Sequence, residues 1–133
     1  MDQGILIFGG VLLSLGIIAL VRWHQPRHEV IVYGIALAPT AGAYVVFALL
    51  NSATSALPHE LLGVPLYGGL GLAGLWRWPL LIALGWAGHV AWDLASSGGS
   101  SPSYAPSWWP TVCVGTDLFL AGYITALVWP KKS

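Results

Sequence analysis

The sequence predicts an all-α protein: a single domain, residues 1–133, folded as an integral membrane bundle of about five transmembrane helices. Three observations lead to this prediction. Of the 133 residues, 56% are hydrophobic and 8% are charged, whereas soluble domains carry about 25% charged residues. Five apolar segments follow one another, each about 20 residues long, which is the length that crosses a ~30 Å hydrocarbon core. The cationic residues gather in alternate connections between these segments.

The apolar segments span approximately residues 4–23, 30–50, 57–76, 79–95 and 111–129. The first is expected to be a retained helix and not a secretory signal, because no positive charge precedes it and Arg22 follows it. Strands are disfavoured, because the segments are apolar on all sides and lipid cannot satisfy an open sheet edge. The third segment is rich in glycine and contains Pro65, so a short or re-entrant element is the alternative there.

Positive charges predict the orientation, since cytoplasmic loops collect lysine and arginine. Five spans would place all of them on one side of the membrane, whereas a third segment that turned back would divide them. We therefore expect a membrane protein with its N-terminus outside and its C-terminus in the cytoplasm. Glu29 and the histidines near it are expected in an exposed inner loop. The residues at this predicted inner rim are Arg22, Arg27, Arg77, Lys131, Lys132, Trp23, Trp76, Trp78 and Trp129.

Composition and context also exclude some partners and sites. The formal net charge is zero, and nucleic acid would require a basic patch. The expected partners are membrane lipids and, in one hypothesis, other membrane-protein subunits. Gly69, Gly71 and Gly74 match the dinucleotide pattern G-x-G-x-x-G, but they lie inside an apolar segment and predict close helix packing instead. Cys113, the only cysteine, is expected to be a small apolar side chain in a helix.

Four ionisable residues lie inside the apolar segments: Glu60, His89, Asp93 and Asp117. Burying such groups in lipid is costly unless they find partners. His89 and Asp93 are four residues apart, so a helix places them on one face. Counting at about 1.5 Å per residue puts Asp93 and Asp117 each about 10 Å below the outer boundary. These residues are therefore expected to converge in the outer half of the bundle, with Tyr44 at a similar level.

This cluster has three interpretations. Carboxylates and an imidazole without thiolate suit a divalent metal ion such as zinc, manganese or ferrous iron, with Glu60, His89, Asp93 and Asp117 as ligands. Such a metal would activate water for attack on a substrate that enters from the lipid. Without a metal, His89, Asp93 and Asp117 would be catalytic acid and base groups that exchange protons. In the third interpretation the same groups bond to one another, to indoles or to backbone, and hold the helices together.

The C-terminal half contains a distinctive set of residues. They are Leu84-Gly85-Trp86, His89, Trp92-Asp93-Leu94, Trp109-Pro110, Cys113, Gly115 and Asp117-Leu118. On these residues, positions 57–125 resemble a family of small bacterial multi-span membrane proteins that is catalogued as a domain of unknown function. The resemblance implies a protein of a bacterial inner membrane, of this size, and it implies no particular activity. It also implies histidines after the Trp-Asp pair, where this chain has serines, and this departure weakens the metal interpretation.

Three functions fit these features. The first is a membrane-embedded site that depends on a metal ion or on protons. The second is a non-catalytic accessory subunit of a larger membrane protein complex. The third is a binder of lipid or of a small apolar ligand, in a groove beside Trp86 and Tyr67. Whether the chain is an enzyme depends on which of these functions holds.

Overall fold

The computed structural model describes residues 2–52, 54–97 and 108–129, with side chains throughout except at 56 and 93–97. Within these ranges the chain forms five α-helices and one short 3₁₀ turn, without a strand. The all-α prediction is therefore confirmed for this part of the chain, and the helices begin and end within a few residues of the predicted segments. They are α1 (Gln3–His24), α2 (Glu29–Leu50), η1 (Thr54–Ala56), α3 (Leu57–Trp76), α4 (Leu80–Ser97) and α5 (Trp109–Val128).

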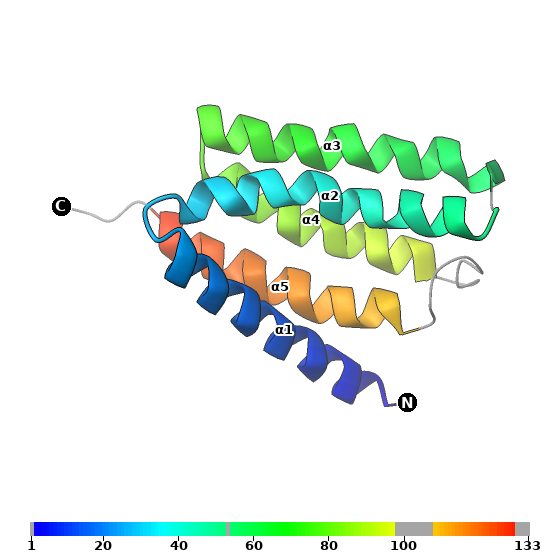
Figure 1. Cartoon of the computed structure of the whole chain (residues 1–133), viewed down its shortest axis with the longest axis horizontal. Helices are drawn as coiled ribbons and strands as arrows, with labels where there is room; N and C mark the ends of the chain where they lie inside the picture. Colours follow the sequence, from blue (N-terminus) through cyan, green and yellow to red (C-terminus); the bar gives the residue numbers. More distant parts are fainter. Residues whose placement is uncertain (1, 53, 98–107, 130–133) are drawn as a thin grey trace.

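Consecutive helices run in opposite directions, so the bundle has two distinct ends (Figure 1). α2 packs along α3, and α5 packs along both α1 and α4. α3 also lies against α4, which joins these groups into one bundle. α1 and α2 are consecutive in the chain but make little contact, and α1 diverges from α2 toward its N-terminus. Each of the first two helices is therefore held by a different neighbour.

α3 is one continuous helix that runs the length of the bundle (Figure 1). The alternative of a re-entrant third segment is therefore wrong, although Pro65 lies within the helix. The physical reason is packing along the whole helix. Gly63 faces the ring of Trp92 on α4 near one end, and Gly71 faces α2 nearer the other, so α3 is supported on both sides of the proline.

The exterior of the bundle is apolar, and several of its polar side chains lie inside. α1, α2 and α5 are long and apolar enough to cross a membrane, and α4 contains a shorter apolar stretch, Leu80–Trp92. The most deeply buried side chains include the polar residues Glu60, His89 and Asp117. This distribution is the one expected of helices that face lipid. Large apolar side chains are exposed on every helix, among them Phe8, Leu20, Ile35, Leu49, Leu62, Leu72, Leu84 and Leu118.

One end of the bundle gathers arginines and exposed tryptophans. The α1–α2 and α3–α4 connections lie there, together with the end of α5. Arg22, Arg27 and Arg77 therefore share one end, as the sequence predicted, while Lys131 and Lys132 lie outside the described residues. We call this the arginine end. Four exposed tryptophans lie at the same end: Trp23, Trp76, Trp78 and Trp129.

Glycines allow α3 to approach its neighbours closely. A Cβ atom at Gly71 would collide with the carbonyl oxygen of Gly34 on α2, and one at Gly74 would collide with Ile82 of α4. The predicted packing role is thus confirmed for Gly71 and Gly74. It is wrong for Gly69, which is exposed and has open space where a Cβ would lie. The G-x-G-x-x-G pattern therefore consists of two glycines at helix contacts, Gly71 and Gly74, and one glycine on the exposed surface, Gly69.

The interface between α1 and α5 is built in the same way. A Cβ at Gly115 would collide with the carbonyl oxygen of Ile7 on α1, and one at Gly10 would collide with the backbone of α5. Thr116 adds a polar contact, because its hydroxyl donates to the carbonyl oxygen of Gly10 at 3.0 Å. Close backbone approach and a side-chain hydrogen bond therefore fix α1 on α5.

Gly71→Ala is expected to lower the free energy of unfolding by about 1–3 kcal/mol, the usual cost of extra volume in a packed interface. The new methyl group would push α2 away from α3 at Gly34. Denaturant titration in detergent micelles measures the change. Gly69→Ala on the same helix is the matched control, and it should be neutral or slightly stabilising because alanine favours the helix. Equal stability of the two variants would contradict the close approach.

Candidate functional site

His89 on α4 and Asp117 on α5 form a buried pair. Nδ1 of the imidazole lies 2.9 Å from Oδ2 of the carboxylate, and each residue is 1% exposed. The two residues are far apart in sequence, and they meet because α4 and α5 are antiparallel neighbours. One proton occupies the hydrogen bond between them. The convergence predicted from helix depth is confirmed for these two residues.

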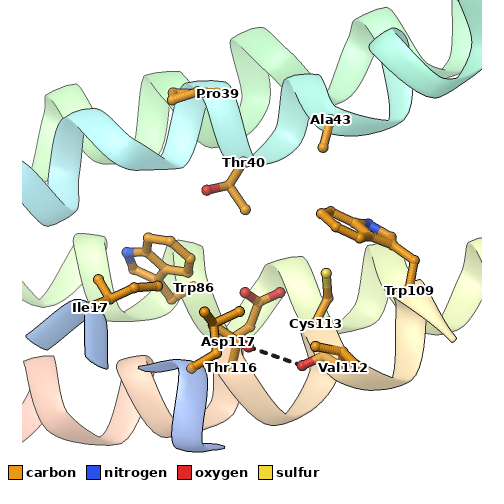
Figure 2. Close-up of a pocket in the computed structure, with 11 residues that line it drawn as sticks. Ile17, Pro39, Thr40, Ala43, Trp86, Trp109, Val112, Cys113, Thr116 and Asp117 are labelled. Atoms are coloured by element: carbon orange, nitrogen blue, oxygen red, sulfur yellow. Dashed lines mark hydrogen bonds between the residues drawn. The ribbon is translucent and has the colours of Figure 1, made fainter. Parts of the chain in front are cut away.

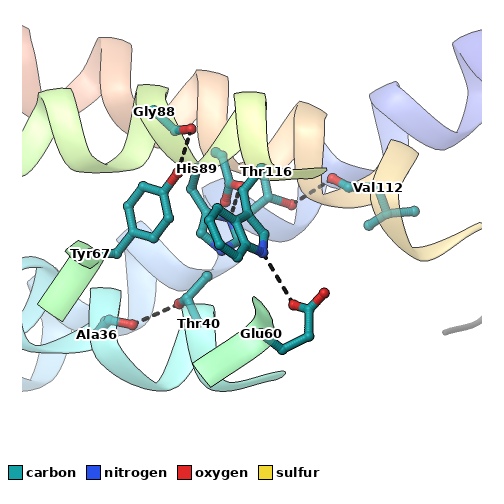
Figure 3. A network of polar contacts seen from close by, with 10 residues as sticks. Ala36, Thr40, Glu60, Tyr67, Gly88, His89, Val112 and Thr116 are labelled. Atoms are coloured by element: carbon teal, nitrogen blue, oxygen red, sulfur yellow. Dashed lines mark hydrogen bonds and ion pairs between the residues drawn. The ribbon is translucent and has the colours of Figure 1, made fainter. Parts of the chain in front are cut away.

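Two buried tyrosines enclose the imidazole of His89. The ring of Tyr67 on α3 meets it in an edge arrangement with the centroids 5.0 Å apart. The ring of Tyr44 on α2 lies 6.4 Å away, at the level predicted for it. The hydroxyl of Tyr67 donates to the carbonyl oxygen of Gly88 at 2.9 Å (Figure 3). This contact anchors Tyr67 to the helix that carries His89, so the imidazole has a fixed aromatic wall.

Glu60 on α3 has a different partner. Its Oε2 accepts a hydrogen bond from the indole N–H of Trp92 at 3.2 Å, and the same indole stacks on His59 with the centroids 4.6 Å apart. The ring of Tyr67 touches both Trp92 and His89. Glu60 therefore belongs to a neighbouring aromatic cluster, and Tyr67 links that cluster to the His89–Asp117 pair.

The four predicted site residues do not come together as one described group. Asp93 lies on α4, but its side chain is outside the described residues. Among the side chains that the structure describes, no three or more histidines, cysteines or carboxylates are grouped so that they could hold a metal ion. A metal ligated by Glu60, His89, Asp93 and Asp117 thus stays a prediction. Of these four residues, the structure shows only His89 and Asp117 in direct contact with each other.

A cavity of about 330 Å³ lies against the pair, with Asp117 in its wall. Residues of α1, α2, α4 and α5 line it, and Asp117, Cys113 and Trp109 point from α5 toward α2 (Figure 2). Leu13 of α1 and Pro39 of α2 also line the cavity and are exposed at the surface. The cavity therefore opens sideways between α1 and α2, midway along the bundle, and not at one of its ends.

The cavity wall is almost entirely apolar. Asp117 is the only carboxylate among the described residues that line it, and none of them is a lysine, arginine or histidine. The hydroxyls of Thr40 and Thr116 are engaged with backbone carbonyl oxygens. The indole N–H of Trp86 likewise donates to a backbone carbonyl, that of Tyr33, at 3.2 Å. An apolar wall with one carboxylate is the composition typical of a site for a small ligand.

A third buried carboxylate lies at the arginine end. Glu29 begins α2 and is buried, so the expectation of an exposed loop is wrong for this residue. Its Oε1 accepts hydrogen bonds from the hydroxyl of Tyr33, at 2.9 Å, and from that of Tyr123 on α5. Arg22 Nε on α1 lies 3.9 Å from the other carboxylate oxygen. This group, the Glu29 cluster, ties α1, α2 and α5 together.

The Glu29 cluster could be inferred only in part from the sequence. Glu29 and Tyr33 are four residues apart, so on a helix they share one face. That signal required the helix to begin at Glu29, whereas the charged and polar residues before it indicated a loop. Tyr123 lies on α5, far from Glu29 in the sequence, so no local sequence pattern could predict the contact between them.

Comparison with protein-family models, curated proteins and solved structures gives no match. The resemblance to a bacterial membrane family therefore stays a prediction. Fold and site together define the class of protein: an all-helical bundle with an apolar exterior and a His–Asp pair beside an apolar cavity that opens to the surface. Function has to be argued from that geometry.

A double-mutant cycle of His89→Ala and Asp117→Ala is expected to give a coupling energy of about 1–3 kcal/mol, because each change alone leaves a buried polar partner behind. Unfolding of the full chain in mixed micelles measures the four stabilities. The control cycle pairs Asp117→Ala with Tyr33→Phe, which affects the Glu29 cluster, and it should be additive within about 0.5 kcal/mol. Additive effects in the first cycle would show that the contact contributes nothing.

Proposed function

We propose that the chain is an integral protein of a bacterial inner membrane that crosses it five times, with the N-terminus outside. Three helices are long and apolar enough to span, and the exposed apolar side chains on all five helices favour lipid around the whole bundle. The arginine end is then cytoplasmic, because cytoplasmic loops retain positive charge. α3 is less apolar, and it crosses because α2 and α4 pack against it.

Within that membrane, the protein binds a small amphiphilic ligand in the cavity beside Asp117. The observation that carries this proposal is that a single residue, Asp117, both lines the apolar cavity and bonds to His89. The wall would hold an apolar body, and the carboxylate would fix a polar group. The cavity volume of about 330 Å³ is near the lower limit of roughly 300–1,000 Å³ for such sites, so the ligand is small.

The ligand enters from the lipid. The cavity lies between α1 and α2, which make little contact with each other. Its rim residues Leu13 and Pro39 are exposed on what would be the lipid-facing surface. An apolar molecule dissolved in the bilayer would therefore reach Asp117 without crossing water.

The chemistry that fits the site is proton exchange. A proton donated by the ligand to Oδ1 of Asp117 would neutralise the carboxylate, while the imidazole of His89 holds Oδ2 through the 2.9 Å contact. This needs only the two residues that are in contact. The metal-dependent alternative needs further ligands, and Glu60 is bonded to Trp92 instead. A non-catalytic role as an accessory subunit of a larger membrane complex stays a prediction.

Single cysteines in a Cys113→Ser background test the orientation. Asn51→Cys follows α2 at the end opposite the arginines and is expected to react with a membrane-impermeant maleimide in intact cells. Gln25→Cys, in the α1–α2 connection, should react only after permeabilisation. Both positions are exposed, so access is limited only by the membrane. The reverse pattern would overturn the orientation, and immediate reaction at both positions would overturn the membrane barrier between them.

Cys113 reports on the cavity, because it is the only cysteine and lines the cavity wall. Ala43→Phe on α2 would fill part of the same space. It is expected to slow alkylation of Cys113 by N-ethylmaleimide about tenfold, since the reagent needs free volume beside the thiol. Mass spectrometry of the purified full chain measures the rate. Ala126→Phe, on the exposed side of α5, is the control and should leave the rate unchanged. Equal rates in both variants would mean that the cavity does not admit a small molecule.

A further inference from the structure

We propose that the ligand of the cavity is a lipophilic organic cation, an amine or ammonium group on an apolar body. The inference rests on the proposed function, and it specifies the charge of the ligand. Three features support it: the charge of the His89–Asp117 pair, the indole rings in the cavity wall, and a lining without a positive side chain among its described residues.

The His89–Asp117 pair favours a cation over an anion. With one proton in the hydrogen bond, the pair carries one negative charge. With a second proton on the imidazole, imidazolium and carboxylate cancel. In both states the carboxylate oxygens of Asp117 are hydrogen-bond acceptors. An ammonium group beside Asp117 therefore gains an opposite charge or a strong acceptor, whereas a carboxylate or phosphate group gains neither.

The surroundings strengthen this preference. A buried negative charge in an apolar wall interacts strongly with a nearby cation, because the local dielectric constant is low. The protein does not supply that cation from the described side chains, since none of those that line the cavity is positive. Arg22, which could otherwise compete, lies at the arginine end beside Glu29. A cationic ligand would bring a positive charge next to Asp117.

Two tryptophans favour an organic cation over a metal ion. Trp86 and Trp109 both line the cavity with Asp117 (Figure 2). Indole rings attract ammonium groups through their π-systems, and carboxylates with aromatic rings recognise quaternary ammonium ligands. A hydrated magnesium or calcium ion needs about six or more oxygen ligands, which the apolar wall does not provide. An alkyl or aryl body would pack against that wall while its ammonium group lies at Asp117.

Three probes of one shape, differing in charge, test the inference. They are (2-phenylethyl)trimethylammonium, its neutral carbon isostere (3,3-dimethylbutyl)benzene, and the anion 2-phenylethanesulfonate. The purified full chain in a non-ionic detergent is incubated with each probe, and protection of Cys113 from N-ethylmaleimide is measured against probe concentration, corrected for partition into the micelle. The cation is expected to protect at about a tenfold lower concentration than the neutral isostere, and the sulfonate should not protect.

Asp117→Asn is the decisive variant, because it keeps the shape of the side chain and removes its charge. It should bring cation and neutral isostere to equal affinity while protection by the neutral probe persists. Tyr123→Phe, in the Glu29 cluster away from the cavity lining, is the matched control and should keep the full preference. If Asp117→Asn does not fold, Ala43→Lys tests the same point, since a fixed positive charge in the wall should abolish protection by the cation alone.

The two proposals fail in distinguishable ways. Equal protection by the cation and the neutral isostere in the unmodified protein would overturn the cation inference and leave the binding cavity standing. A preference for the cation that survives Asp117→Asn would also overturn it, since the carboxylate would not be its source. Protection by neither probe would overturn the proposed binding function itself, and the cation inference with it.

Discussion

A polar side chain buried inside a helical bundle is cut off from bulk water, so a partner on a neighbouring helix stabilises it strongly. This constraint organises the molecule. His89 on α4 is hydrogen-bonded to Asp117 on α5. Glu60 on α3 accepts a hydrogen bond from the indole of Trp92 on α4. Glu29 accepts hydrogen bonds from tyrosine hydroxyls on α2 and α5. Each contact fixes the rotation and the height of one helix against its neighbour. Polar partners thereby define a register that apolar packing alone would leave free to slide.

The cavity follows from how the helices divide their contacts. Glycines bring α2 against α3 and α1 against α5 closely enough for backbone to meet backbone. A helix held so tightly on one side cannot also fill the space on its other side. α1 and α2 make little contact with each other, and the volume between them is lined by apolar side chains, by the indoles of Trp86 and Trp109, and by Asp117. The same close packing that stabilises the bundle leaves room for a ligand.

The position of Asp117 gives that space its chemistry. The carboxylate is hydrogen-bonded to the imidazole of His89, and two tyrosines pack against that imidazole. These contacts fix the orientation of the carboxylate on the side away from the cavity. Its cavity side is surrounded by apolar and indole groups. A site of this kind discriminates by charge and by shape, because a weakly polar environment amplifies a single charge. The Glu29 cluster, by contrast, has its carboxylate occupied by two hydroxyls and an arginine, and its contribution is to hold three helices at the arginine end.

The sequence by itself determined the helical class, the helix bounds and the end at which the arginines gather, because composition and segment length act locally along the chain. Helix depth also placed Asp117 in the same outer half of the bundle as His89, although it matched the height of Asp117 to that of Asp93. Only the tertiary structure decided that Glu60 bonds to Trp92, that Glu29 is buried against Tyr123, and that a cavity opens between α1 and α2. Those outcomes depend on which helices become neighbours and how each is rotated. Side chains that are far apart in the sequence determine the choice of neighbouring helices and the rotation of each helix. Local sequence patterns cannot predict either.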